Sequence, residues 1–198
     1  MTRLLSLLAL LTSLASCGGD LNDPPADLGN FALGHNIVVA PDLVKGPLSR
    51  EASKDEWIEA MKSAMAARFE RYEGDRFYHF GVNVSGYVLA QPGVPLVFSP
   101  KSALVITVSV WDDKLNKKLN PEPYQITVTE DFSGGSILVG SGWASTREQQ
   151  IKNLTFSAAR AVERWLEQNR ECLGDDVPPE VEADCWNTKS TGPDLGSQ

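Results

Sequence analysis

Residues 103–111, Ala-Leu-Val-Ile-Thr-Val-Ser-Val-Trp, form the most regularly patterned stretch of this chain. From Leu104 to Val110 every second side chain is large and apolar, and the side chains between them are smaller or polar. Successive side chains of a β-strand point to opposite faces of a sheet, so this period of two predicts a strand with one apolar face. We expect this strand to lie centrally in a sheet.

Other segments are predicted to extend beside it; they are residues 36–40, 77–88, 124–129 and 136–143. The first contains the continuous apolar run Ile37-Val38-Val39, which is typical of a buried strand. Residues 77–88 alternate, with Val88 expected on the apolar face and Gly86 at a bulge or a close approach. The pair Gly134-Gly135 predicts a turn between the last two segments.

Two amphipathic helices are each predicted from a capping box followed by an apolar stripe. Ser53 and Glu56 have the spacing of such a box, and Ser145 and Glu148 repeat it. The inner face of the first helix is expected to carry Trp57, Ile58, Met61, Met65, Phe69 and Tyr72. The inner face of the second is expected to carry Ile151, Leu154, Ala158, Ala161 or Val162, Trp165 and Leu166. We interpret both stripes as core packing.

The order of these elements is strand, helix, several strands joined by turns, and helix. Amphipathic helices and a sheet can bury their apolar faces against each other. The predicted fold class is therefore α+β: a two-layer sandwich of a mostly antiparallel sheet with four to five strands and two amphipathic helices. The second face of the sheet then also requires a cover.

The first residues of the chain have the plan of a secretory leader, with Arg3 followed by an apolar core from Leu4 to Leu14. The stretch Leu14-Ala15-Ser16-Cys17 resembles the lipobox of bacterial lipoproteins. This resemblance implies that residues 1–16 are removed and that Cys17 carries acyl chains such as palmitate. The alternative is an ordinary secretory signal cleaved after Ser16, which leaves Cys17 as a thiol or in a disulfide.

The predicted domains follow from this leader. Residues 17–33 are expected to be the lipidated N-terminus with a flexible tether, residues 34–170 the folded domain, and residues 171–198 an irregular tail. In enterobacterial lipoproteins, an aspartate directly after the lipidated cysteine marks retention in the inner membrane. Here that position is Gly18, so we expect an outer-membrane lipoprotein that faces the periplasm.

Cysteine usage is consistent with an oxidising compartment. If Cys17 is acylated, Cys172 and Cys185 remain of the three cysteines. The simplest interpretation is a disulfide between them that closes part of the tail, and free thiols are the alternative.

Composition and motifs exclude several function classes. The formal net charge is −8, and nucleic-acid binding depends largely on Lys and Arg, so we expect no nucleic-acid partner. The sequence lacks a Gly-x-Ser-x-Gly elbow, a His-Glu-x-x-His pair and a phosphate-binding loop, and we therefore expect no enzyme, metal or cofactor. Asp112 and Asp113 are expected in a solvated turn, and Asp175 and Asp176 in the tail. His79 is expected on the polar face of its strand.

The layout is similar to that of the periplasmic domains of curli-secretion-type lipoproteins and the TolB amino-terminal domain, and the chain resembles conserved uncharacterised alphaproteobacterial lipoproteins. This resemblance implies a non-enzymatic accessory protein of the bacterial envelope. Acyl chains on Cys17 would hold it to a membrane, and an envelope protein would bind the sheet edge or the apolar loop 91–102. The apolar side chains of that loop are Val94, Leu96, Val97 and Phe98. The alternative is that this loop packs over the edge of the domain.

Two alternatives remain open at this point. One is a pore-forming or secretion-associated oligomeric lipoprotein, which requires hairpins of two long strands. Only residues 103–111 approach the necessary length in the predicted pattern. The other is an enzyme with an unrecognised site, which a deep pocket enclosing two carboxylates would indicate.

Overall fold

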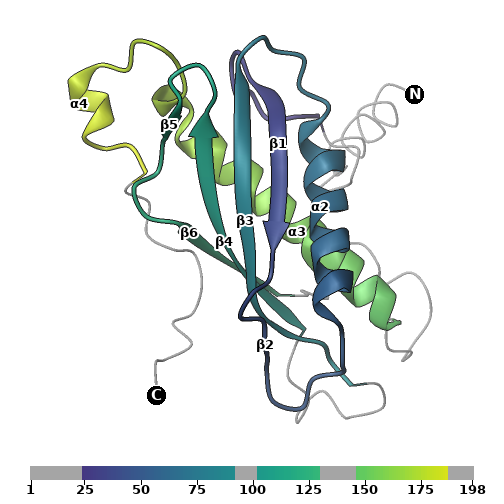
Figure 1. Cartoon of the computed structure of the whole chain (residues 1–198). Helices are drawn as coiled ribbons and strands as arrows, with labels where there is room; N and C mark the ends of the chain where they lie inside the picture. The colour runs from purple at the N-terminus through teal and green to yellow at the C-terminus, as the bar shows by residue number, and fades with distance from the viewer. Residues whose placement is uncertain (1–23, 92–101, 130–145, 187–198) are drawn as a thin grey trace, which may run out of the picture. The chain divides into compact units, whose positions relative to one another are not determined.

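The computed structural model describes residues 24–91, 102–129 and 146–186, and all of these belong to one compact unit. The fold is mixed α+β, with a six-stranded, mostly antiparallel sheet and two long helices (Figure 1). The elements are β1 (Ala32–Val39), β2 (Val44–Lys45), α2 (Lys54–Phe69), β3 (Phe77–Val88), β4 (Ala103–Asp112), β5 (Lys117–Lys118), β6 (Tyr124–Thr129), α3 (Arg147–Gln168), the 3-10 helix η2 (Arg170–Cys172) and α4 (Pro179–Glu182). The predicted fold class is confirmed.

Strand β4 is central, as its pattern predicts. It pairs antiparallel with β3 on one side and with β5 and β6 on the other. Its apolar side chains Leu104, Ile106, Val108 and Val110 are completely buried. One face of β4 therefore supplies the middle of the hydrophobic core.

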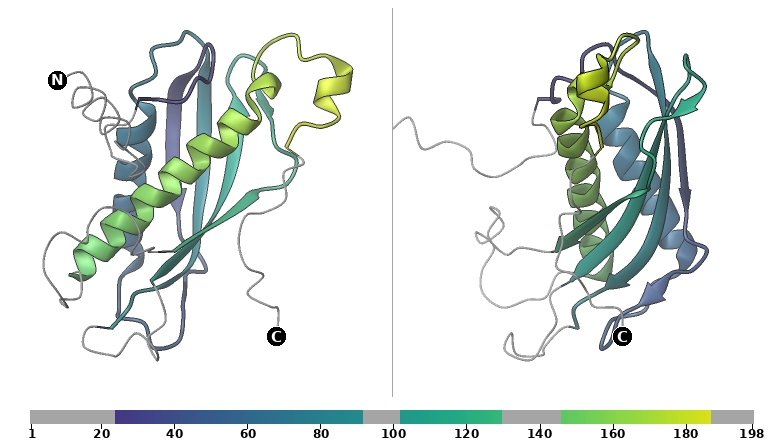
Figure 2. Two further views of the ribbon diagram at one scale, coloured as in Figure 1. Left: turned by 180° about the vertical axis from the view of Figure 1, so that it is seen from behind. Right: turned by 90° about the vertical axis from the view of Figure 1, so that its left-hand side faces the viewer.

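Helices α2 and α3 both cover the same face of this sheet, as Figure 2 shows. The capping box at Ser53 and Glu56 is present, with reciprocal bonds between each side chain and the other residue's backbone N–H. The box of α3 lies one residue later than predicted, because Thr146 and Gln149 form it instead. Ser145 with Glu148 and Thr146 with Gln149 both match the sequence pattern of a capping box. The residue at which the helix begins decides which pair forms it.

The prediction that Ile37-Val38-Val39 forms a buried strand is wrong for two of its three residues. Strand β1 lies parallel to β3, with α2 in the crossover between them, and only Val38 points to the helices. Ile37 is 58% exposed and Val39 is 45% exposed. An apolar run indicates burial on both faces only where both faces are covered, and here both long helices of the described residues lie on the same face.

Strand β3 departs from its predicted alternation after Val84. The register with β4 shifts between Val84 and Gly86, so that Tyr87 takes an inward position opposite Leu104. Val88, which we expected on the apolar face, is half-buried instead. The bulge expected near Gly86 explains this change, since one extra residue reverses the order of faces. At 12 residues, β3 is also longer than β4, contrary to the expectation that only residues 103–111 approach such a length.

The predicted boundary between tether and domain is too late in the chain. Leu28 and Phe31 lie within the expected tether, yet both belong to the hydrophobic core. The Phe31 ring stacks on Tyr78 with a centroid distance of 5.0 Å. Residues 24–31 are polar enough to suggest a linker, but these two apolar side chains suffice to bind the segment to the domain.

A buried ion pair between the two helices also holds this segment. Arg68 on α2 donates from Nε to Oε2 of Glu163 on α3 at 2.6 Å, and both side chains are buried. Oε1 of Glu163 accepts from the hydroxyl of Tyr72 at 2.6 Å and from the backbone N–H of Ala26 at 3.4 Å. Burial, followed by the contact with Glu163, raises the pKa of Tyr72. The carboxylate of Glu163 thus joins both helices to the N-terminal segment.

The tail is ordered further than its sequence suggests. Trp186 packs against Trp165 of α3 at a centroid distance of 5.2 Å, and its backbone N–H donates to Asn169. None of the described helices is long and apolar enough to cross a membrane. Leader residues 1–16, the predicted strand 136–143 and most of loop 91–102 lie outside the described residues.

Candidate functional site

The face of the sheet opposite the helices is the most distinctive surface of the described domain, and we call it the open face. It includes, as strand alternation and register place them, Ile37, Val39, Phe77, His79, Gly81, Asn83, Val105, Thr107, Ser109, Trp111, Lys118, Gln125 and Thr127. Besides the two β1 residues, Phe77 and Trp111 are also about half exposed. Scattered exposed apolar residues are ordinary, but a group on one sheet face indicates a contact surface.

On β1, β3 and β4 the open face carries no Asp, Glu, Lys or Arg, and its charged residue is Lys118 on β5. The whole chain is 22% charged, with a formal net charge of −8, so this composition differs sharply from that of the rest of the protein. The cores of protein interfaces are depleted of charged residues and enriched in aromatic ones. The open face has both properties.

A local distortion of β1 holds His79 at one end of this face. The backbone N–H of His35 donates to Nδ1 of His79 at 2.7 Å, so the proton of the ring is placed on Nε2, which lies 3.0 Å from Oδ1 of Asp113. The two imidazole rings stack at 4.8 Å. A Cβ on Gly34 would overlap the His79 ring, so a larger residue at this position in the β1 irregularity would require the ring to move. Since both ring nitrogens have partners, His79 acts here as a link between strands.

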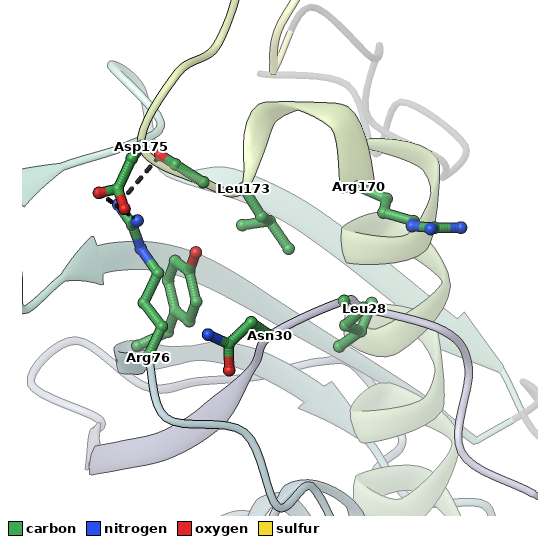
Figure 3. A pocket seen from close by; sticks show the side chains of 9 residues that line it. Leu28, Asn30, Arg76, Arg170, Leu173 and Asp175 are labelled. Atoms are coloured by element: carbon green, nitrogen blue, oxygen red, sulfur yellow. Dashed lines mark hydrogen bonds and ion pairs between the residues drawn. The ribbon is translucent and has the colours of Figure 1, made fainter.

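A separate cavity of about 320 Å³ lies where the N-terminal segment, the start of β3 and the end of α3 meet. Its lining residues are Leu28, Gly29, Asn30, Arg76, Tyr78, Arg170, Leu173, Gly174 and Asp175. Figure 3 shows Arg76 reaching Asp175 on one side of this cavity and Arg170 on the other. Burial raises the pKa of Tyr78 to about 12, so its hydroxyl stays protonated.

An ion network forms one wall of the cavity. Arg76 donates to Oδ2 of Asp112 from Nε at 2.8 Å and from a terminal nitrogen at 2.5 Å, and it contacts Asp175 at 2.5 Å. Lys114 binds the other oxygen of Asp175 at 2.5 Å. Contacts with Lys114 and then Arg76 lower the pKa of Asp175. Both carboxylates are therefore bound to cations, and neither is arranged as a general acid.

The expectation that Asp112 lies in a solvated turn is wrong, because this side chain is buried. The sequence contained a signal for this position. Asp112 continues the inward series that ends at Val110, two residues earlier, so alternation places it on the core face. Its partner Arg76 precedes β3 and was not predicted from the sequence.

The tail contributes Gly174 and Asp175 to the cavity, and a disulfide closes this part of the chain. Cys172 and Cys185 are bonded, with their Cα atoms 5.7 Å apart. This is the pair that the cysteine count singles out. Within residues 24–91, 102–129 and 146–186, no group of three or more His, Cys, Asp or Glu side chains is placed to hold a metal ion.

The remaining predicted site residues lie outside the described part of the chain. They are the lipidation residue Cys17 and the loop residues Val94, Leu96, Val97 and Phe98. Their roles stay predictions. The open face was anticipated only as a sheet surface in need of a cover.

No family model and no curated protein matches the chain. It is similar to a solved structure from Xanthomonas campestris of family DUF330, with 13% identity, a TM-score of 0.42 and coverage of 74% of this chain and 91% of that chain. It is also similar to a minor lipoprotein from Acinetobacter baumannii, with 18% identity, a TM-score of 0.28 and coverage of 65% and 94%. Similarities at this level assign no family and carry no functional argument.

Proposed function

We propose that this chain is a non-enzymatic, lipid-anchored accessory protein of the bacterial envelope that binds a protein through its open face. Acyl chains on Cys17 attach it to the outer membrane, and the domain faces the periplasm. The observation that carries this proposal is the disulfide between Cys172 and Cys185. Such bonds form in oxidising compartments, and this one leaves the lipobox cysteine as the remaining cysteine of the sequence.

The N-terminal segment supports an anchor close to the domain. Pro24, the first described residue, is seven positions after Cys17, and Leu28 is already in the core. An extended chain spans at most about 3.3–3.6 Å per residue, so Pro24 lies within about 25 Å of the lipidated residue. The domain is thus held near the membrane surface. Two or three acyl chains supply stable attachment without help from charged lipids.

The open face supports the interaction part of the proposal. Its surface is uncharged on β1, β3 and β4 and partly aromatic, and it fits the core of a protein interface. We retain the loop residues Val94, Leu96, Val97 and Phe98 as a second candidate contact. Catalysis is not part of this proposal, because the carboxylates at the cavity are already bound to Arg76 and Lys114.

The anchor is tested by labelling cells with an alkynyl palmitate and measuring the mass of the mature N-terminus. We expect label on the wild-type protein and none on Cys17→Ala. The double variant Cys172→Ala/Cys185→Ala should keep the label and serves as the control for cysteine loss. An unlabelled mature protein with an unmodified thiol at Cys17 would refute the anchor.

The interaction surface is tested separately with a photo-crosslinking residue at Ser109, in the middle of the open face. The matched control places the same residue at Glu59, an exposed position of α2 on the other side of the sheet. We expect a protein adduct from position 109 and none from position 59. Equal yields at the two positions would refute the open face as the contact surface.

A further inference from the structure

We infer that the open face is covered by a second copy of this chain, packed sheet against sheet about a two-fold axis that runs along β3. This inference rests on the proposed function and names the partner of the same face. It follows from the relief of the face, from its charge and from the position of the N-terminal segment.

The relief of the open face is self-complementary. Ile37 and Val39 project from β1 as an apolar ridge. Beside them lies a shallow trough, which contains Gly81 on β3 and Ser109 and Thr107 on β4. Among the described residues, the Ser109 Cβ at 3.9 Å is the only atom within 4 Å of a Cβ placed on Gly81, so this trough is open.

The strand register places the ridge and the trough at the same height along the strands. Ile37 is aligned with Gly81, which is paired with Ser109. Val39 is aligned with Asn83, which is paired with Thr107. A two-fold rotation about an axis parallel to the strands preserves position along the strands and exchanges the two sides of the axis. With the axis at β3, the ridge of each copy enters the trough of the other.

The lack of charge on β1, β3 and β4 permits close contact at this face. Two copies with a formal net charge of −8 each repel one another, and charged surfaces cannot be brought together without opposite partners. On β1, β3 and β4, the strands that overlap about this axis, the open face has no Asp, Glu, Lys or Arg, so burial there leaves no unpaired charge.

The same axis suits two chains anchored in one membrane. Phe31 and Ala32 bond to Gly74 and Arg76, so the N-terminal segment joins the domain at the end where β3 begins. Rotation about an axis along β3 leaves this end of both copies on the same side. Both Cys17 residues then reach one membrane surface, whereas an axis across the strands would direct the two anchors to opposite ends.

The size of the face determines how strong this contact can be. About an axis along β3, β1 of each copy faces β4 of the other, so three strands overlap. Three strands about 4.8 Å apart and seven residues at about 3.4 Å each give about 340 Å² per copy, and about 690 Å² for the pair. Stable interfaces between proteins in solution bury about 1,200–2,000 Å². The dimer is therefore weak for free chains, and anchoring in one membrane favours it by raising the effective concentration.

The test uses the full-length lipidated protein in phospholipid vesicles. Since Cys172 and Cys185 are bonded and Cys17 is acylated, an added cysteine is the free thiol. Asn83→Cys lies on the proposed axis, and Thr127→Cys on β6 lies two strands away, so that its two copies are about 20 Å apart. With a short bifunctional thiol reagent, we expect covalent dimers from Asn83→Cys and at least about tenfold fewer from Thr127→Cys.

Gly81→Val supplies the discriminating variant. Its side chain fills the trough but meets only an ordinary contact with Ser109 in the monomer, so the fold should be retained. Filling a packed contact costs about 1–3 kcal/mol, which corresponds to a loss of about fivefold to over a hundredfold in dimer from Asn83→Cys. An unchanged thermal transition with this loss supports the inference.

The outcomes separate this inference from the proposed function. Protein that floats with the vesicles but forms no dimer from Asn83→Cys overturns the second copy and leaves the anchor intact. Dimer formation that is insensitive to Gly81→Val also overturns it. In cells, an adduct of Asn83→Cys with a different protein refutes the second copy while it supports the interaction surface.

Discussion

Replacing Phe31 with alanine should destabilise the domain by about 3–5 kcal/mol, the usual cost of removing a fully buried phenylalanine. The ring of Phe31 has no exposed surface and lies 5.2 Å from the ring of Tyr72 and 5.0 Å from that of Tyr78. The surrounding side chains cannot easily fill the cavity left by the ring, because Phe69 of α2 and Tyr78 of β3 hold its two sides. We therefore expect a value in the upper part of the range.

The measurement is urea unfolding of the mature full-length chain, followed by circular dichroism, with a thermal scan in parallel. For a chain of this size, a loss of about 1 kcal/mol in the free energy of unfolding lowers the midpoint of thermal unfolding by about 2–4 °C. Phe31→Ala should therefore lower this midpoint by about 6–20 °C. The control is Leu48→Ala, which removes a 70% exposed side chain and should stay within about 0.5 kcal/mol of wild type. A loss below about 1 kcal/mol for Phe31→Ala would show that residues 24–31 are a tether after all.

Three further changes test other parts of the structure. Glu163→Gln leaves the buried Arg68 without its counter-charge and should cost about 3–5 kcal/mol in urea unfolding; a neutral result would refute the ion pair as a clamp. The side-chain bond from Arg147 and the Ser53 backbone N–H lower the pKa of Glu56 to about 2, so wild-type stability should fall as pH decreases from about 4.5 to about 2, and Glu56→Gln should lack this component. Gly34→Ala should cost about 1–3 kcal/mol by displacing the His79 ring, and a double-mutant cycle with His79→Ala should abolish that cost; additive effects would contradict the contact.

Local patterns predicted much of the fold. The alternation from Leu104 to Val110 gave the central strand, because a period of two leaves a single way to bury four large apolar side chains. The capping box at Ser53 and Glu56 marked the start of α2, since both of its hydrogen bonds are made within one helical turn. The box of α3 was displaced by one residue, because neighbouring residues offered equivalent caps.

The candidate site was much less predictable, since its parts come from distant segments. Asp112 meets Arg76 across a strand pair and Asp175 lies beyond α3, so no short window of sequence contains this network. Gly34 and His79 are likewise brought together only by the pairing of β1 with β3. The spacing of residues in a sequence predicts their contacts only within one regular element, and these contacts join different elements.

The sequence by itself predicted the leader and determined the alternating strands and the apolar helix stripes, because each depends on residues within a few turns or a few pleats of one another. Only the tertiary structure decided which of these apolar groups are covered. Both long helices pack on one face of the sheet, so Val38 is buried while Ile37 and Val39 remain exposed. Burial depends on what lies opposite a side chain, and that partner comes from a distant part of the chain.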